Sequence, residues 1–289
     1  MKIKILIPVY NDFESASKLI EEINSKITNL IYEFSIILVN DASTDKVELD
    51  ISKIDKINSI KIINMKENIG HARCIATGLK YIFENEEFDY VIPMDGDGED
   101  RPEEILKFLE FIKYDDSKPI VGERIKRSEG LFFELSYAAH KLITYVFTGY
   151  SIKFGNYTCL PKSTVKKMIN DKATWSSFSG SLTKVEKNRS TIPSIRGTRY
   201  FGPSKMSFYN LIKHSLSIIA VFKANVIIRS ILFYLIYLFL ISKNITYITS
   251  IPLILVIIFA VSVQGISKRE NLDKLNNSLL NILNIDNLK

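Results

Sequence analysis

The sequence predicts an α/β fold in which a mostly parallel sheet is covered by helices on both faces and is followed by a pair of membrane helices. Three observations predict this fold class. Short runs rich in Ile and Val alternate with amphipathic segments across the first half of the chain. Polar loops follow several of these runs, and two long apolar segments lie near the carboxyl end.

Short apolar runs in the first half are expected to form the buried strands of the sheet. They are rich in β-branched residues, and they cover residues 2–9, 33–40, 59–65, 88–94 and 118–124. Apolar residues recur at helical spacing between them, in segments 13–27, 70–85 and 101–114. Strand and helix alternate in the way that is typical of parallel sheets.

Polar residues gather where the first, second and fourth of these strands end. The loops read YNDFE at 10–14, NDASTD at 40–45 and MDGDGED at 94–100. Ligands of parallel sheets bind at the carboxyl ends of the strands. We therefore expect these three loops to converge on one binding site.

The third loop crowds carboxylates that repel one another unless something positive lies among them. They are Asp95, Asp97, Glu99 and Asp100. Asp95 and Asp97 supply hard oxygen ligands that suit Mg²⁺ or Mn²⁺. The alternative interpretation is a solvated acidic turn, but a position directly after a buried strand and beside two other polar loops favours a metal site.

The carboxyl-terminal third predicts a membrane hairpin. Residues 225–241 carry a single charge, Arg229, and residues 245–266 carry none, so that each can cross a hydrocarbon core of about 30 Å. The preceding segment, 206–223, has the pattern of an amphipathic interfacial helix. The alternative is a pair of buried helices in a soluble core.

The expected domains are a catalytic domain at 1–205, the interfacial helix at 206–223, the transmembrane hairpin at 224–266 and a polar cytoplasmic tail at 267–289. Basic residues concentrate on both flanks of the hairpin, at Lys205, Lys213, Lys223, Arg229, Lys268, Arg269 and Lys274. The positive-inside rule then predicts a multi-pass protein of the inner (cytoplasmic) membrane with its catalytic domain in the cytoplasm.

Composition limits the classes of partner. The net charge of +6, from 38 Lys and Arg against 32 Asp and Glu, fits an anionic membrane surface or a phosphate-bearing substrate, although a generally lysine-rich composition explains part of it. No basic run is interleaved with aromatic residues, which disfavours nucleic acid. Cys74 and Cys159 are far apart and are expected to be reduced thiols.

Several motifs, in this order and spacing, give the chain a family resemblance. They are ILIPVYND at 5–12, VNDASTD at 39–45, NIGHARCIATG at 68–78, MDGDGEDRPEEI at 94–105, GERIKR at 122–127 and RYFGPSKMS at 199–207. The chain resembles the family-2 glycosyltransferases, which have the Rossmann-like GT-A fold. Within that family it resembles the polyprenyl-phosphate glycosyltransferases, the group that includes dolichol-phosphate mannose synthase and its bacterial relatives with two membrane helices.

The resemblance implies a role for each residue that matches a motif. The nucleotide pocket would contain Pro8, Tyr10, Asp12, Asp41, Arg73 and Asp95. Asp95 and Asp97 would hold the metal ion, and the catalytic group would be Asp97, Glu99 and Asp100. Asp41 would accept a hydrogen bond from the edge of the base, and its alternative role is a helix N-cap.

The acceptor would be a lipid phosphate, which needs cations at the level of the headgroups. The residues expected to supply this site are Arg124, Arg127, Arg199, Ser204 and Lys205. The alternative is that these side chains merely hold the domain on anionic lipid. A phosphate acceptor is already ionised at neutral pH, so that this chemistry requires no strong general base, and the family's displacement inverts the anomeric configuration.

The chain departs from the family at two places. Asn156 stands where an acid is expected, within FGNYTCLPKSTV at 154–165, and it cannot act as a base. The Gln-x-x-Arg-Trp motif of processive members is absent, which disfavours a polymerising synthase. The histidines are expected on helix surfaces, in the core or at the interface, at His71, His140 and His214.

The expected function is therefore an inverting, metal-dependent transfer of a sugar from a nucleotide-sugar, with a UDP-sugar favoured, to a polyprenyl phosphate in the synthesis of cell-envelope glycans. The resemblance also implies a homo-oligomer that packs through its helices. One alternative keeps the fold but glycosylates a lipid-linked saccharide or another glycan. A second alternative is a non-catalytic membrane scaffold, against which the intact DGDGED and NDASTD motifs argue.

Overall fold

The computed structural model describes residues 1–27, 30–47, 49–126, 131–203 and 208–289. Its strands form one sheet in the order β7-β5-β6-β4-β1-β2-β3-β8. Their bounds are β1 Lys2–Val9, β2 Glu33–Asn40, β3 Ser59–Met65, β4 Tyr90–Pro93, β5 Ile120–Lys126, β6 Phe154–Pro161, β7 Ser190–Ile195 and β8 Ile282–Asn287.

Helices follow or separate these strands. Those of the globular part are α1 Phe13–Lys26, α2 His71–Asn85, α3 Glu104–Ile112, α5 Lys162–Ile169, the 3₁₀ helix η1 Lys172–Trp175, and α6 Phe178–Val185. The other helices are α4 Leu131–Thr148, α7 Phe208–Ala220, α8 Lys223–Ile241, α9 Tyr247–Ser267, α10 Leu272–Asn276 and the 3₁₀ helix η2 Ser278–Asn281.

Strand directions confirm the prediction of a mostly parallel α/β sheet. β1 runs parallel to both β2 and β4, β2 parallel to β3, and β5 parallel to β7. The antiparallel strands are β6, between β4 and β5, and β8, beside β3. The loops after β1, β2 and β4 therefore leave the same edge of the sheet, since these strands are parallel neighbours.

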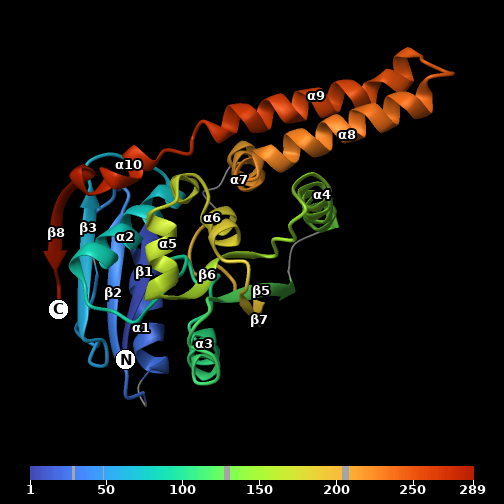
Figure 1. Ribbon diagram of the computed structural model, residues 1–289. Helices are drawn as coiled ribbons and strands as arrows, with labels where there is room; N and C mark the ends of the chain where they lie inside the picture. Colours follow the sequence, from blue (N-terminus) through green and yellow to red (C-terminus); the bar gives the residue numbers. More distant parts are fainter. Residues whose placement is uncertain (28–29, 48, 127–130, 204–207) are drawn as a thin grey trace.

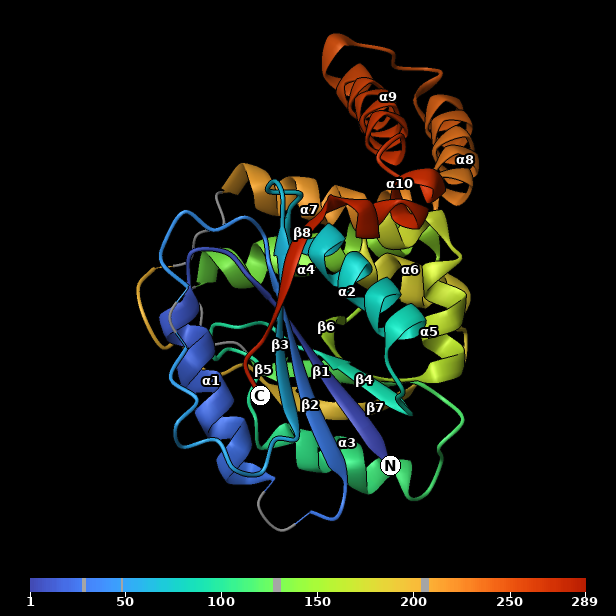
Figure 2. The ribbon, with the colours of Figure 1, turned by 90° about the vertical axis from the view of Figure 1, so that its left-hand side faces the viewer.

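Apolar side chains fill the space on both faces of the sheet. Figure 2 shows α1 on one side of the strands and α2 and α5 on the other. One cluster joins α1 and α3 to the first face, and includes Ile5, Leu19 and Phe108; a second joins α2, α5 and α6 to the opposite face, and includes Leu6 and Leu79. Such double coverage explains why the central strands read as nearly continuous apolar runs.

The segment 267–289, predicted to be a polar cytoplasmic tail, returns to the sheet. β8 pairs antiparallel with β3 and forms the edge of the sheet. Asp286 accepts a hydrogen bond from the side chain of Asn64 (2.7 Å), which in turn accepts one from Asn40 (2.8 Å). The polar residues of this short segment therefore pair with polar residues of the strands, a contact that amphipathic patterning does not reveal.

Two long apolar helices, α8 and α9, leave the globular part as an antiparallel hairpin (Figure 1). Their length and composition suffice to cross a membrane, and little of their surface is buried within the protein. The segments before and after the hairpin both pack on the sheet domain, through α7 and β8. If α8 crosses a membrane, α9 must therefore cross it back.

The helix α4 has no counterpart among the predicted elements. It follows β5 and packs against α8 and α7 (Figure 1). The sequence of α4 mixes apolar and small polar residues without an obvious capping signal, and its partners lie far along the chain in the hairpin. The strand β7 was also not predicted, because its pairing with β5 depends on residues about seventy positions away.

Candidate active site

The three polar loops meet at the carboxyl edge of β1, β2 and β4, as the sequence predicts. The loop after β2 is tied to β1 by the Asp41 N–H, which donates to the carbonyl of Val9 (2.9 Å). The start of the acidic loop is tied to β1 by the Met94 N–H, which donates to the carbonyl of Leu6 (3.0 Å). Figure 1 shows this edge turned toward the side on which α7 and the hairpin lie.

Each carboxylate of the acidic loop has its own positively charged or polar partner. The His71 ring lies 2.9 Å from Asp95, and the Asn156 amide donates to the same oxygen (3.3 Å). Asp100 lies 3.9 Å from the Arg124 guanidinium and accepts a hydrogen bond from the Asp95 N–H (2.9 Å). The four crowded carboxylates can coexist because cationic side chains from distant segments lie among them.

Arginines of the 196–201 segment supply the remaining partners. Arg199 donates to Asp97 (2.8 Å) and also bonds Asp12, so that one guanidinium joins the loops after β1 and β4. Arg196 forms an ion pair with Glu99. The structure places Arg199 beside Asp97 and Asp12, within the acidic cluster, and its predicted role at the acceptor phosphate stays a prediction.

The 196–201 segment lies directly on the acidic loop. The Gly197 N–H donates to the carbonyl of Glu99 (2.8 Å), and the Tyr200 N–H donates to the carbonyl of Asp97 (2.9 Å). Gly98 has a φ of +88°, and a Cβ there would stand 2.5 Å from the Tyr200 ring. Glycine at 98 is therefore required both for the backbone conformation and for the contact.

The carboxylates of the acidic loop differ in the direction in which their pKa is shifted. Burial, followed by the negative charge of Asp95, raises the pKa of Asp97 to about 6 and the pKa of Asp100 to about 7. Burial acts on Asp95 in the same direction, but the charge and hydrogen bond of His71, with Arg124 and Asn156, outweigh it and hold the pKa of Asp95 well below its usual value. Asp97 and Asp100 therefore take up a proton at a higher pH than Asp95 does.

His71 was expected to be a surface or core residue, and it belongs to this site. Burial lowers the pKa of His71, but the charges of Asp95, Asp100 and Asp97 outweigh burial and raise it. Its place directly after Gly70, at the start of a helix on the carboxyl edge, is the signal that could have identified it. Asn156, the departure from the family pattern, faces the same carboxylate.

Asp41 binds the backbone at the start of α2. Its carboxylate accepts hydrogen bonds from the N–H groups of Ile69 (2.7 Å) and Gly70 (2.9 Å), and the residue is 4% exposed. This contact resembles capping, the alternative role, because the carboxylate satisfies backbone donors at the start of a helix. It places the His71 end of α2 beside the acidic loop, and recognition of the base by Asp41 stays a prediction.

The other residues of the predicted nucleotide pocket border the same edge. Pro8 lies within β1, Tyr10 is 44% exposed and Asp12 is held by Arg199. The Arg73 guanidinium lies 5.5 Å from the centre of the Trp175 ring, and its Nε is buried without a hydrogen-bond partner among the described residues. Arg127, Ser204 and Lys205 lie outside the described residues.

The carboxylates of the acidic loop fit a hard divalent cation only if a bound substrate and water supply the other oxygen ligands. Within the described ranges, no group of three or more His, Cys, Asp or Glu side chains is arranged to hold a metal ion. Two carboxylates, Asp95 and Asp97, face cationic partners that a metal ion could replace. Mg²⁺ commonly takes one or two carboxylates and completes its shell with water and substrate phosphates, so that this pair fits such an ion.

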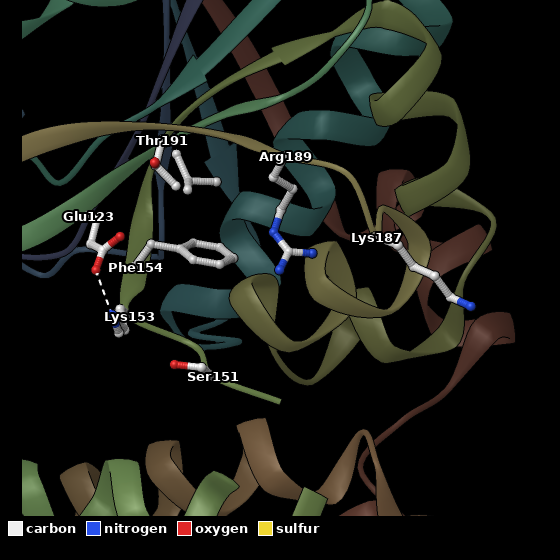
Figure 3. A pocket seen from close by; sticks show the side chains of 8 residues that line it. Glu123, Ser151, Lys153, Phe154, Lys187, Arg189 and Thr191 are labelled. Carbon is white, nitrogen blue, oxygen red and sulfur yellow. Dashed lines mark ion pairs between the residues drawn. The ribbon is translucent and has the colours of Figure 1, made fainter. Parts of the chain in front are cut away.

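Two hollows lie near this edge. One of about 750 Å³ borders the loop after β1 and includes Asp12, Lys18, Asp45 and Phe201. The other, of about 250 Å³, is shown in Figure 3 between β5, β6 and the end of α6, where Lys153 pairs with Glu123 (3.0 Å). None of the predicted site residues lines the second hollow, so it does not belong to the acidic site.

A model of the family described as glycosyl transferase family 2 matches residues 4–175, which include all three polar loops. The chain belongs to this family. The family 2 chain is 29% identical over 218 residues to undecaprenyl-phosphate 4-deoxy-4-formamido-L-arabinose transferase of Salmonella choleraesuis (strain SC-B67). The alignment covers 73% of this chain and 64% of that relative, so that the chain spans less than two thirds of the relative's length.

Solved structures show the same fold. Glucosyl-3-phosphoglycerate synthase from Mycobacterium tuberculosis matches in complex with Mn²⁺, UDP and glucosyl-3-phosphoglycerate (TM-score 0.50) and in complex with Mg²⁺ and UDP (TM-score 0.51). Each match has 12% identity and covers 78% of this chain and 79% of the other. The family 2 chain therefore has the GT-A fold that its motifs imply.

Proposed function

We propose that this family 2 chain transfers a sugar from a nucleotide-diphosphate donor to a polyprenyl phosphate at the cytoplasmic face of the inner membrane. The observation that carries the proposal is the acidic loop at 95–100, which is held among cationic side chains at the edge of the sheet that faces two apolar helices. The relative's activity on undecaprenyl phosphate supports the acceptor class, and the UDP in structural neighbours supports a UDP-sugar.

On the donor side, a Mg²⁺ or Mn²⁺ ion held by Asp95 and Asp97 would neutralise charge on the leaving diphosphate. Structural neighbours bind either ion together with UDP, which supports both choices. Arg73, at the start of α2, has a buried Nε without a hydrogen-bond partner in the part of the chain that the structure describes, and would contribute positive charge to the diphosphate. Tyr10 and Pro8 would wall the nucleotide, and Glu99 would lie near the donor sugar.

On the acceptor side, Arg124 lies at the end of β5 within reach of Asp100. A lipid phosphate that approached from the membrane side would meet this guanidinium, and Arg199 becomes available when Asp97 binds the metal ion. Arg127, Ser204 and Lys205 complete the proposed acceptor set from the sequence. A phosphate oxygen is an ionised nucleophile at neutral pH, so that orientation and charge neutralisation carry most of the catalysis.

A saccharide hydroxyl is the second candidate acceptor, and one observation favours it. Burial and the neighbouring Asp95 raise the pKa of Asp100 to about 7, which is the range in which a carboxylate works best as a general base at neutral pH. A hydroxyl acceptor needs such a base, whereas a phosphate does not. The two candidates therefore predict different effects of Asp100→Asn: a large loss for a hydroxyl acceptor and a small loss for a phosphate acceptor.

The test is a screen of detergent-purified full-length protein with radiolabelled nucleotide sugars against polyprenyl phosphate and lipid-linked saccharides. We expect label in the polyprenyl-phosphate fraction with a UDP-sugar, dependent on Mn²⁺ or Mg²⁺ and abolished by a chelator. Glu110→Gln, on the exposed face of α3, is the matched control for carboxylate substitutions. Absence of both turnover and nucleotide binding with Mn²⁺ present would support the scaffold alternative and refute the proposal.

A further inference from the structure

The hollow shown in Figure 3 lies on a face of the sheet near its β7 edge and is separate from the acidic loop. Its volume is about 250 Å³. Its polar lining consists of three cations, two hydroxyl groups and one carboxylate, from Lys153, Lys187, Arg189, Ser151, Thr191 and Glu123. We call it the β7 hollow, and its lining is rich in hydrogen-bond donors and positive charge.

Arg189 is a partly buried cation whose guanidinium is only partly used. Its Nη1 donates to the carbonyls of Thr183 (3.4 Å) and Glu186, at the end of α6. Among the described residues, its Nε and Nη2 have no hydrogen-bond partner and no carboxylate forms an ion pair with it. Burial lowers the pKa of Arg189 and outweighs the nearby charge of Glu186. An anion in the hollow would stabilise this desolvated charge.

An aromatic ring holds this guanidinium in place. The central carbon of the Arg189 guanidinium lies 5.5 Å from the centre of the Phe154 ring. Figure 3 shows the guanidinium beside that ring, at the hollow. Phe154 in turn packs against buried apolar clusters. Because its position is fixed by the ring and by α6, the guanidinium is suited to bind the oxygens of a planar or tetrahedral anion.

The second cation belongs to a pair that an anion can open. The ammonium of Lys153 lies 3.0 Å from the Glu123 carboxylate, and the two side chains are 50% and 32% exposed. An exposed pair of this kind contributes little to stability, so that the ammonium can turn toward a ligand. The Arg124 N–H donates to the carbonyl of Lys153 (3.3 Å), which holds its backbone beside β5. The exposed residues Ser151 and Thr191 add hydroxyl donors to the same hollow.

The segment that supplies most of this lining carries the basic excess of the chain. Residues 151–190 contain eight Lys and Arg against two Asp and Glu, a net charge of +6. The whole chain has the same net charge, so that the charges of all other residues balance. A generally lysine-rich composition would distribute the excess along the chain. Its concentration in one segment indicates an anionic partner at this face.

We propose that the β7 hollow binds a phosphate group through Arg189 and Lys153, with Lys187 adding positive charge at the rim. The group belongs to the headgroup of an anionic lipid or to a free phosphate ion, because both offer the same oxygen acceptors. A hollow of about 250 Å³ suits a headgroup or an ion better than a whole nucleotide. This binding does not require the reaction proposed for the acidic loop.

The wall of the hollow begins at the base of the hairpin. The ring of Tyr150 stacks on that of Phe222, which directly precedes α8, with centroids 4.4 Å apart. Ser151 follows Tyr150 and lines the hollow. A lipid headgroup beside the hairpin would therefore lie near the hollow, provided that the hairpin enters the membrane as the proposed function requires. A free phosphate ion would need no such insertion.

The test is isothermal titration calorimetry of detergent-purified full-length protein with inorganic phosphate at constant ionic strength. We expect saturable binding to the wild type and a loss of affinity of about tenfold or more in Arg189→Gln, because charge-assisted hydrogen bonds disappear. Lys166→Gln, on the exposed face of α5 in the same basic segment, is the matched control and should bind like the wild type. Arg124→Gln should also keep this binding, which separates the hollow from the acceptor side of the acidic loop.

Substitutions of the Lys153–Glu123 pair test the sign of the effect. Glu123→Gln should bind phosphate several-fold more tightly, because it removes a like charge and releases the ammonium, whereas Lys153→Gln should bind several-fold more weakly. If Arg189 only caps α6, Arg189→Gln lowers the melting temperature and all three variants bind phosphate like the wild type, which would overturn the proposal. Should Arg189→Gln not fold, unchanged affinity in both variants of the pair would overturn it.

The source of the phosphate is distinguished in nanodiscs of phosphatidylcholine with and without phosphatidylglycerol. If the ligand is a lipid headgroup, phosphatidylglycerol should suppress the phosphate titration several-fold and should remain bound to purified wild type but not to Arg189→Gln. If the ligand is the free ion, phosphate affinity should be equal in both kinds of disc. Absence of phosphate binding together with equal lipid retention by wild type and Arg189→Gln would overturn the proposal. Nucleotide binding and sugar transfer are measured separately, so that their failure refutes the proposed function and not the β7 hollow.

Discussion

The acidic loop after β4 and the base of the α8–α9 hairpin both hold charged side chains against a partner, but the partners differ. At the loop, carboxylates meet movable cationic side chains such as Arg199 and His71. At the hairpin, Arg229 donates to the backbone carbonyl of Val146, which is held in place by its helix. The contrast shows which charges can be exchanged for a ligand: those paired with side chains can be released to a metal ion or a phosphate, whereas those paired with a helix end hold the architecture.

Removing one exchangeable charge gives the largest expected effect. Asp97→Asn should lower sugar transfer by about 100- to 1,000-fold, because it would remove a proposed ligand of the metal ion and a partner of Arg199. Thermal stability in detergent should stay equal or rise, since burial of the Asp97 carboxylate is costly, as its raised pKa indicates. Steady-state kinetics with and without Mn²⁺, beside Glu110→Gln, measure the effect; full activity of Asp97→Asn would remove the basis for the metal site.

The second largest expected effect is a pH dependence of stability that the acidic loop should show and the base of the hairpin should not. The pKa of Asp100 is about 7 in the folded state against 3.8 for a free carboxyl, so that between these values the folded state binds more protons than the unfolded state. The free energy of unfolding should therefore fall as the pH rises from 4 to 7. Asp100→Asn should remove this fall and gain on the order of 3 kcal/mol over the wild type at pH 7.

The measurement is denaturant unfolding at several pH values in the absence of divalent cations. The difference between wild type and Asp100→Asn isolates this carboxyl from the others in the chain. A difference that is constant from pH 4 to pH 7 would contradict the raised pKa. The difference between wild type and Arg229→Gln should be constant over this range, because arginine stays protonated throughout it and Asp100 is present in both.

Alanine substitutions at two glycines, one in the acidic loop and one in the hairpin, test how strictly each region requires its backbone conformation. Gly98→Ala should destabilise the protein by about 1–3 kcal/mol, because φ is +88° and the new methyl would meet the Tyr200 ring. Gly265→Ala, in α9, meets nothing within 4 Å and should be neutral or stabilising by up to about 1 kcal/mol. Thermal unfolding compares them, and equal effects would show that the 196–201 segment does not press on the acidic loop.

The meeting of the three polar loops was predictable from the sequence because it depends on local signals. A buried strand followed at once by carboxylates predicts where the acidic cluster lies, and parallel order brings Asp12, Asp41 and Asp95 to one edge. The partners of those carboxylates were not predictable in this way. Arg199 lies 102 residues from Asp97, and no periodicity relates the two.

The membrane-side half was less predictable for a related reason. The length and apolarity of α8 and α9 can be seen in the sequence. The positions of α4 and β8, in contrast, depend on contacts with residues that are distant in the chain. β8 is a short edge strand of mixed polarity, and its Asp286 accepts a hydrogen bond from Asn64 of β3, a residue more than two hundred positions away. Tertiary contacts, and not local propensity, decide such elements.

The smallest expected effect belongs to the His71–Asp95 pair, and its sign depends on pH. The pKa of His71 is raised in the folded state, so that its contribution to stability is fully present below the pKa of the unfolded histidine and is lost as the pH rises through the folded value. The side chain is 43% exposed, which limits the contribution to below about 1 kcal/mol. His71→Gln should therefore be less stable than wild type at pH 6 and equal to it at pH 9. Denaturant unfolding at these two pH values measures the difference, and a loss that is larger at pH 9 would mean that His71 acts by packing and not by its charge.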